Sequence, residues 1–100
     1  MMTNAGVKEF FDKYPGRTCA IHLNNAKSML IDYEGKYQTK TTDISYETVG
    51  GCDLLVVDHV DISSGREVHF KSYVVTEFIE SIDVMSEEDA QYRLDPLKIL

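Results

Sequence analysis

The chain opens with an apolar stripe at the spacing of a helix, and the positions between its members are mostly charged. The stripe consists of Val7, Phe10, Phe11 and Tyr14. Thr3 or Asn4 can cap the start of this helix, and Pro15-Gly16 can end it. The pattern therefore predicts a short amphipathic helix over about 5–14 that packs on another element.

After Gly16 the hydrophobic period changes from that of a helix to that of extended strands. Asn24-Asn25-Ala26 is expected to be a turn, since asparagine tolerates the left-handed backbone region. Glu34-Gly35-Lys36 is expected to bend the chain within one long strand. The predicted strands cover residues 18–23, 28–33 continuing over 37–42, 54–62, 66–75 and 79–84.

Three connections complete the pattern. Asp43–Gly51 is the least regular stretch and is expected to be a loop that Gly50-Gly51 closes. Ser63-Ser64-Gly65 suits a three-residue hairpin loop, and Thr76–Phe78 suits a brief turn. Acidic residues after Ser86 favour a short helix to about residue 94, followed by an apolar tail.

The whole order predicts one domain over residues 1–100. The expected fold is mainly β, a small open barrel of about five strongly bent antiparallel strands over about 17–85. The N-terminal helix precedes the barrel, and a short C-terminal helix with a tail follows it at 86–100. A different α+β sheet is the alternative at this stage.

The stretch Val68–Val84, with one short turn between its two strands, resembles the end of an Sm-like barrel. The helix Val7–Tyr14 before the first strand and the short Ser63-Ser64-Gly65 loop also resemble the layout of Sm and Hfq-type proteins. The resemblance is one of pattern over residues 5–85, and it lacks the family's base-binding motifs. Another SH3-like small barrel would give much of the same pattern.

The resemblance implies a cyclic homo-oligomer of roughly five to seven copies, in which one copy's next-to-last strand pairs with the last strand of its neighbour. Five apolar residues are then expected at the seam between subunits, and the alternative is that they fill the core of one monomer. These residues are Val74, Val75, Ile79, Ile82 and Val84.

Composition and charge narrow the function. Hydrophobic residues make up 43% of the chain, as in ordinary globular domains, and the formal net charge of −7 excludes a uniformly basic nucleic-acid coat. There is no apolar run long enough for a transmembrane helix and no basic, apolar leader, so a cytoplasmic protein without membrane contact is expected. In that reducing compartment Cys19 and Cys52 are expected to be plain buried thiols.

Tyrosines interleaved with lysines are the usual combination for binding single-stranded nucleic acid. In a ring that resembles Sm assemblies, Lys71 and Tyr73 would line the pore, with Lys40 and Tyr46 nearby. The predicted function is therefore a ring that binds RNA or single-stranded DNA. The alternative is a structural, adaptor or inhibitor ring, such as a phage-encoded one, that binds a protein partner through its acidic surface.

No catalytic or phosphate-binding motif is present, so enzymatic activity and cofactors are not expected. One face of the 54–62 and 66–75 hairpin could hold a divalent metal, because a three-residue loop would place His59 opposite His69 and Asp61 opposite Glu67. A solvated polar face explains the same residues, and no metal is predicted.

Overall fold

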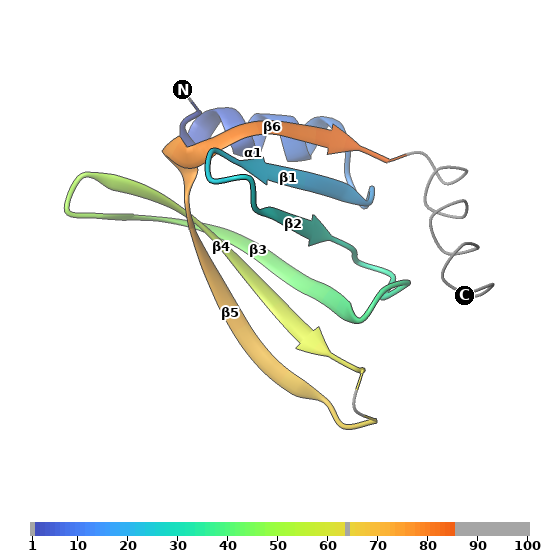
Figure 1. Ribbon diagram of the computed structural model, residues 1–100. Helices are drawn as coiled ribbons and strands as arrows, with labels where there is room; N and C mark the ends of the chain where they lie inside the picture. Colours follow the sequence, from blue (N-terminus) through green and yellow to red (C-terminus); the bar gives the residue numbers. More distant parts are fainter. Residues whose placement is uncertain (1, 64, 86–100) are drawn as a thin grey trace.

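A computed structural model describes residues 2–63 and 65–85 of the chain (Figure 1). The helix and tail expected at 86–100 lie outside the described residues. The described elements are α1 (Asn4–Lys13), β1 (Cys19–Leu23), β2 (Ser28–Ile31), β3 (Thr39–Val49), β4 (Cys52–Asp61), β5 (Val68–Val75), the 3-10 turn η1 (Thr76–Phe78) and β6 (Ile79–Val84).

The strands form two antiparallel sheets of three strands, in the orders β2-β1-β6 and β3-β4-β5. The mainly β, antiparallel architecture is confirmed. Within the described residues no ladder joins the two sheets, so a closed barrel is not found. In Figure 1 the β3-β4-β5 sheet extends below the first sheet, and α1 lies along β1 and β6.

The helix is confirmed to within a residue at each end. Thr3 is its N-cap, since its hydroxyl oxygen accepts a hydrogen bond from the backbone N–H of Gly6 at 3.1 Å. Val7 is fully buried in the core and Phe11 packs against it. The helix ends at Lys13, two residues before Pro15.

The turn between β1 and β2 differs from the prediction in one detail. Ala26, and not an asparagine, adopts the left-handed conformation with φ of 65°. The side chain of Asn25 instead accepts the backbone N–H of Lys27 at 3.1 Å. The turn therefore places an alanine where the backbone favours glycine or asparagine.

The loop expected at Asp43–Gly51 is wrong, because β3 continues to Val49 and pairs with β4 along its length. Ile44 and Tyr46 alternate with polar residues and pack against the core, which is the signal of a half-buried strand. Only the last two residues of the stretch form the turn. Gly50 and Gly51 both have positive φ, 57° and 78°, as a two-residue hairpin requires.

The register of the β4–β5 hairpin is shifted by one residue from the prediction. His59 lies opposite Phe70, and Asp61 lies opposite Val68. The connection is longer than three residues because the Asp61 carboxylate accepts both the N–H and the hydroxyl of Ser63, at 2.9 and 2.6 Å, and turns the chain early. A shift of one residue reassigns every cross-strand pair.

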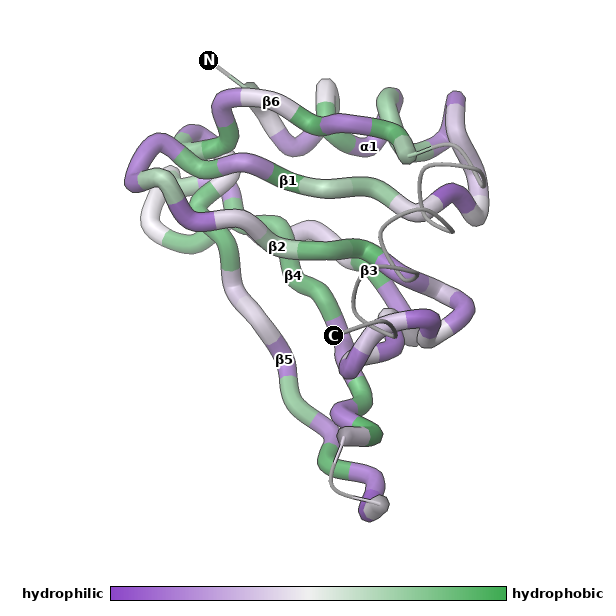
Figure 2. Tube along the Cα trace, turned by 45° about the vertical axis from the view of Figure 1, so that its right-hand side comes forward, coloured by the Kyte–Doolittle hydropathy of each residue, from purple (hydrophilic) through white to green (hydrophobic). Residues whose placement is uncertain are grey.

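The core lies where the two sheets and the helix meet. Its centre is β4, the middle strand of its sheet, whose apolar run is prominent in Figure 2. The buried residues of this core are Val7, Cys19, Ile21, Ile31, Leu55, Val57, Val74 and Ile79.

Candidate functional site

The strand register brings three of the four predicted nucleic-acid residues to one face of the β3-β4-β5 sheet. Lys40 lies opposite Val60, Lys71 opposite Asp58, and Tyr73 opposite Val56. Successive side chains alternate between faces, so these three share the face opposite to Leu55 and Val57. We call it the Lys71 face, defined by Lys40, Lys71 and Tyr73.

Tyr46 is not part of the Lys71 face. It pairs with Leu55, so it lies on the core side of the same sheet, half-buried against the hydrophobic cluster. Burial, followed by the charge of Asp12 and the neighbouring Tyr33, raises the pKa of Tyr46 to about 12. Residues 43–49 were expected to be a loop, so the alternation of side chains along β3 was not used. The sequence pattern therefore could not show that Tyr46 lies on the other face from Lys40, Lys71 and Tyr73.

Charges of both signs lie on the Lys71 face. The Lys71 ammonium is 3.7 Å from the Asp58 carboxylate, and Asp43 lies directly opposite Asp58 in the ladder. Tyr73 is exposed over 56% of its surface, so its ring is accessible for stacking. One copy of this face therefore carries an exposed aromatic next to Lys71, with Lys40 beyond Lys71 and with carboxylates that offset the positive charge.

The residues expected at a subunit seam divide into two groups. Val74 and Ile79 are buried within the core of one chain. Val75, Ile82 and Val84 are half-buried on β5 and β6. Beside them, within the described residues, β5 pairs only with β4 and β6 only with β1, so each strand has one edge without a neighbour.

The four residues weighed as a metal site do not come together as expected, because Phe70 takes the place opposite His59. Among residues 2–63 and 65–85 no group of three or more His, Cys, Asp or Glu is arranged to hold a metal ion. The His59 side chain is 5% exposed, and neither ring nitrogen has a hydrogen-bond partner in the described part of the chain. Burial lowers the pKa of His59.

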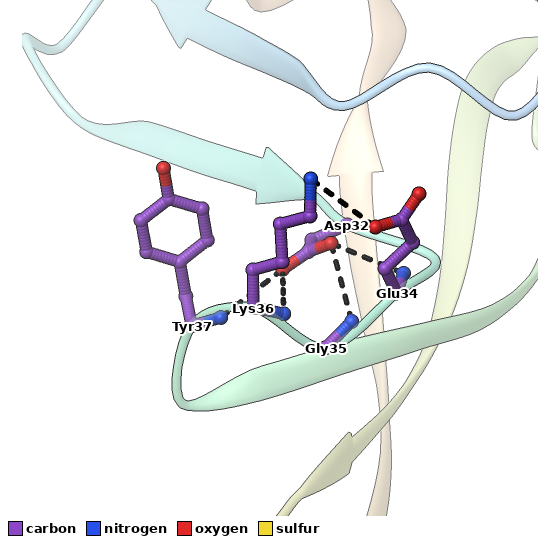
Figure 3. Close-up of polar contacts among 5 residues, drawn as sticks. All are labelled: Asp32, Glu34, Gly35, Lys36 and Tyr37. Carbon is purple, nitrogen blue, oxygen red and sulfur yellow. Dashed lines mark hydrogen bonds and ion pairs between the residues drawn. The ribbon is translucent and has the colours of Figure 1, made fainter. Parts of the chain in front are cut away.

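A buried carboxylate that the sequence pattern did not single out holds the connection between β2 and β3 (Figure 3). Asp32 is fully buried and its oxygens accept four backbone N–H groups at 2.7–3.2 Å. The donors are Glu34, Gly35, Lys36 and Tyr37. Asp32 therefore shapes the loop itself, and its oxygens are fully used in doing so.

His22 and the cysteines have structural surroundings. His22 is half-buried and lies 2.9 Å from the Ser28 hydroxyl and 2.8 Å from the Asp83 carboxylate. Cys19 and Cys52 are both free thiols. Cys19 is buried, and its burial raises its pKa, whereas Cys52 is only half-buried.

No helix in the described part of the chain is long and apolar enough to cross a membrane. Comparisons of the chain with protein-family models, with curated proteins and with solved structures find no match.

Proposed function

We propose that this chain is a subunit of a cyclic Sm-like homo-oligomer that binds single-stranded nucleic acid through the Lys71 face. The order of elements supports the first part. A helix precedes β1, β2 leads through the connection 32–38 into β3 of the other sheet, and β6 returns across a short 3-10 turn to pair with β1. This order resembles the Sm-like layout, in which β2 and β3 correspond to one long bent strand.

The observation that carries the assembly is the pair of strand edges on β5 and β6 that no strand of the described residues covers. An unpaired edge of a sheet is a template for another strand. If β5 of one copy pairs with β6 of the next, the contact is heterologous and repeats until the ring closes. The half-buried Val75, Ile82 and Val84 lie on these two strands and would lose their remaining exposure at such a seam.

The mass in solution tests the assembly. Light scattering at micromolar concentration should give roughly five to seven times the 11.4 kDa of one chain. Val75→Lys on β5 should lower that mass toward one chain, whereas Val49→Lys at the β3–β4 turn should leave it unchanged. A wild-type chain that is monomeric at this concentration contradicts the proposal, and circular dichroism confirms that each variant is folded.

Nucleic-acid binding is supported by the exposed ring of Tyr73, which shares one face with Lys71, two residues before it on β5, and with Lys40 on β3. Lysines contact phosphates, and an exposed ring stacks on a base with about 1–3 kcal/mol per base. The carboxylates of Asp43 and Asp58 weaken the face of a single copy. Several copies in a ring would add their contacts, so binding is expected to require the assembly and to be sensitive to salt.

Fluorescence anisotropy with labelled oligo(U) and oligo(A) tests this binding. Affinity should fall as salt rises, and Lys71→Glu or Tyr73→Ala should weaken it in rings of unchanged mass. Lys27→Glu, at an exposed lysine in the turn between β1 and β2, is the matched control. If neither oligonucleotide binds at low salt, or if Lys71→Glu changes nothing, the nucleic-acid assignment fails.

A second candidate is a ring that binds a protein partner, as an adaptor or inhibitor. The net charge of −7 and the carboxylates on the Lys71 face favour it. A ring of the expected mass that binds neither oligonucleotide would support this candidate over the first. A partner that recognises the acidic surface should be released by salt, and Asp43→Lys should weaken its binding.

A further inference from the structure

A cavity of about 340 Å³ lies between α1 and β3, and its lining includes none of Lys40, Lys71 and Tyr73. Three tyrosines from separate segments line it: Tyr14 follows α1, Tyr33 follows β2, and Tyr46 belongs to β3. All three are half-buried, so part of each side chain stays accessible to a ligand. We call this space the tyrosine cavity, defined by Tyr14, Tyr33 and Tyr46.

Two carboxylates, those of Asp12 and Asp43, line the tyrosine cavity, and they differ in their ion pairs. Asp12 forms an ion pair with Lys8 at 2.9 Å, which offsets its charge. Asp43 is exposed and has no ion pair or hydrogen bond from its side chain among residues 2–63 and 65–85. The lining therefore carries one negative charge that nothing in the described chain balances.

The phenol groups of Tyr33 and Tyr46 are close enough to these carboxylates for the negative charges to add to the rise in pKa that burial causes. Burial and then the Asp12 carboxylate raise the pKa of Tyr46 to about 12, and burial, Cys19 and Asp43 raise the pKa of Tyr33. Both phenols are therefore uncharged at neutral pH. A neutral aromatic ring attracts a cation to its face through its quadrupole.

The chain already contains one contact of this type beside the cavity. The Lys13 ammonium lies 5.6 Å from the centre of the Tyr14 ring. An anion would be repelled by Asp43, and a neutral apolar group would leave that carboxylate without a counter-charge. The lining is thus matched to a small organic cation.

We propose that the tyrosine cavity binds an alkylammonium group, with Asp43 as its counter-ion and the rings of Tyr33 and Tyr46 as its walls. The ligand is either a free quaternary ammonium compound or the ammonium of a lysine side chain, which share this chemistry. The site uses none of Lys40, Lys71 and Tyr73, and Tyr46 lies on the other side of the sheet from them. It shares with the Lys71 face the carboxylate of Asp43, which pairs with Asp58.

Titration with tetramethylammonium chloride tests the site, at constant ionic strength and followed by NMR. The expected result is a saturable change in the signals of Tyr33 and Tyr46, with an upfield shift of the ligand's methyl protons. Neopentyl alcohol, a neutral molecule of similar shape, should bind at least several-fold more weakly. Equal binding of the neutral molecule, or shifts that do not saturate, would overturn the proposal.

Single substitutions test separately the contribution of the Asp43 charge and that of the tyrosine rings to ligand binding. Asp43→Asn should weaken binding about fivefold to tenfold, whereas Glu80→Gln, an equal change of charge on the other sheet, should not. Tyr46→Phe keeps the ring and should keep binding, while Tyr33→Leu should reduce it. Unchanged binding in Asp43→Asn contradicts the proposal even if Tyr33→Leu fails to fold.

A second arm identifies the source of the ammonium group. Nα-acetyl-lysine amide that binds as well as tetramethylammonium supports a lysine side chain as the ligand. Binding of tetramethylammonium alone supports a free quaternary ammonium compound. Neither arm uses nucleic acid, so a failure here does not bear on the proposed function of the Lys71 face.

Discussion

The imidazole of His59 and the ring of Phe70 stack across β4 and β5, with their centroids 4.8 Å apart and their planes 18° apart. The stack helps to bury His59, whose ring nitrogens have no hydrogen-bond partner within the described residues. A charged imidazolium in this place would lack both water and a close acceptor. The fold therefore favours the neutral form of His59.

The pH dependence of stability should reveal this preference. The pKa of His59 is lowered in the folded chain, so the unfolded chain binds a proton first as the pH falls through about 6.5. The free energy of unfolding should then decrease until the pH reaches the folded-state pKa, and level off below it. Urea unfolding at about pH 7.5 and pH 5 measures the loss.

His59→Phe should show a smaller loss than the wild type over that interval, because the titrating group is gone. His69 is an exposed histidine on the neighbouring strand. The control His69→Phe should lose as much unfolding free energy between about pH 7.5 and pH 5 as the wild type, because His59 is still present. An equal loss in His59→Phe and in the wild type would show that His59 is not the source.

Asp32→Asn should be among the most destabilising polar substitutions in this chain. The amide keeps one acceptor oxygen and turns an N–H donor group toward backbone N–H groups that now lack a partner. We expect the free energy of unfolding to fall by about 2–3 kcal/mol. Asp12→Asn, in an exposed pair on α1, should cost no more than about 0.5 kcal/mol in the same urea titration.

The β3–β4 turn should reject side chains at its first glycine. Gly50 has φ of 57°, so a β-branched residue there is strained although the space around it is open. Gly50→Val should destabilise the fold by about 1–2 kcal/mol, while Gly50→Asn should be close to neutral. Equal thermal midpoints for the two variants would contradict the turn geometry.

Two alanine-to-glycine substitutions should act in opposite directions. Ala26→Gly relieves a left-handed backbone and should raise the free energy of unfolding by about 0.5–1 kcal/mol. Ala5→Gly lies in α1 and should lower it by about 0.5–1 kcal/mol. Thermal unfolding of both variants beside the wild type measures the difference, and a loss of stability in Ala26→Gly would be the contrary result.

Periodicity predicted the helix and most strands because each buries one face against the core. It failed over Asp43–Val49, where acidic and hydroxyl residues on the outer face outweighed the two inward residues, Ile44 and Tyr46. The pair Gly50-Gly51 is a signal for a two-residue hairpin turn, and it also fits the end of an irregular loop, so it did not decide between the two. Local propensity could not reveal that β4 supplies a partner for that whole stretch.

Which residues share the Lys71 face depends on the strand register, and the hydrophobic pattern of the sequence does not determine that register. Lys71 and Tyr73 share a face whatever the β4–β5 register, since they are two apart on one strand. Lys40 is on β3, so it joins them only in the observed register. Their carboxylate neighbours, however, follow from the ladder pairs of Asp58. The one-residue shift came from the side chain of Asp61 capping the loop, which spacing alone does not predict.

The central position of β4 has a consequence for how the molecule opens. This strand has a neighbour on both sides, and Leu55, Val56 and Val57 are almost completely shielded from water. Their amide protons can exchange with solvent only when the sheet separates as a whole, whereas the edge of β5 that no described strand pairs with exchanges through small local openings. In deuterium labelling, the amide protons at the centre of β4 should therefore exchange slowly, and those along the edge of β5 should exchange fast. If a strand from a second copy of the chain or from a ligand pairs with this edge, the first sign should be slower amide exchange in β5.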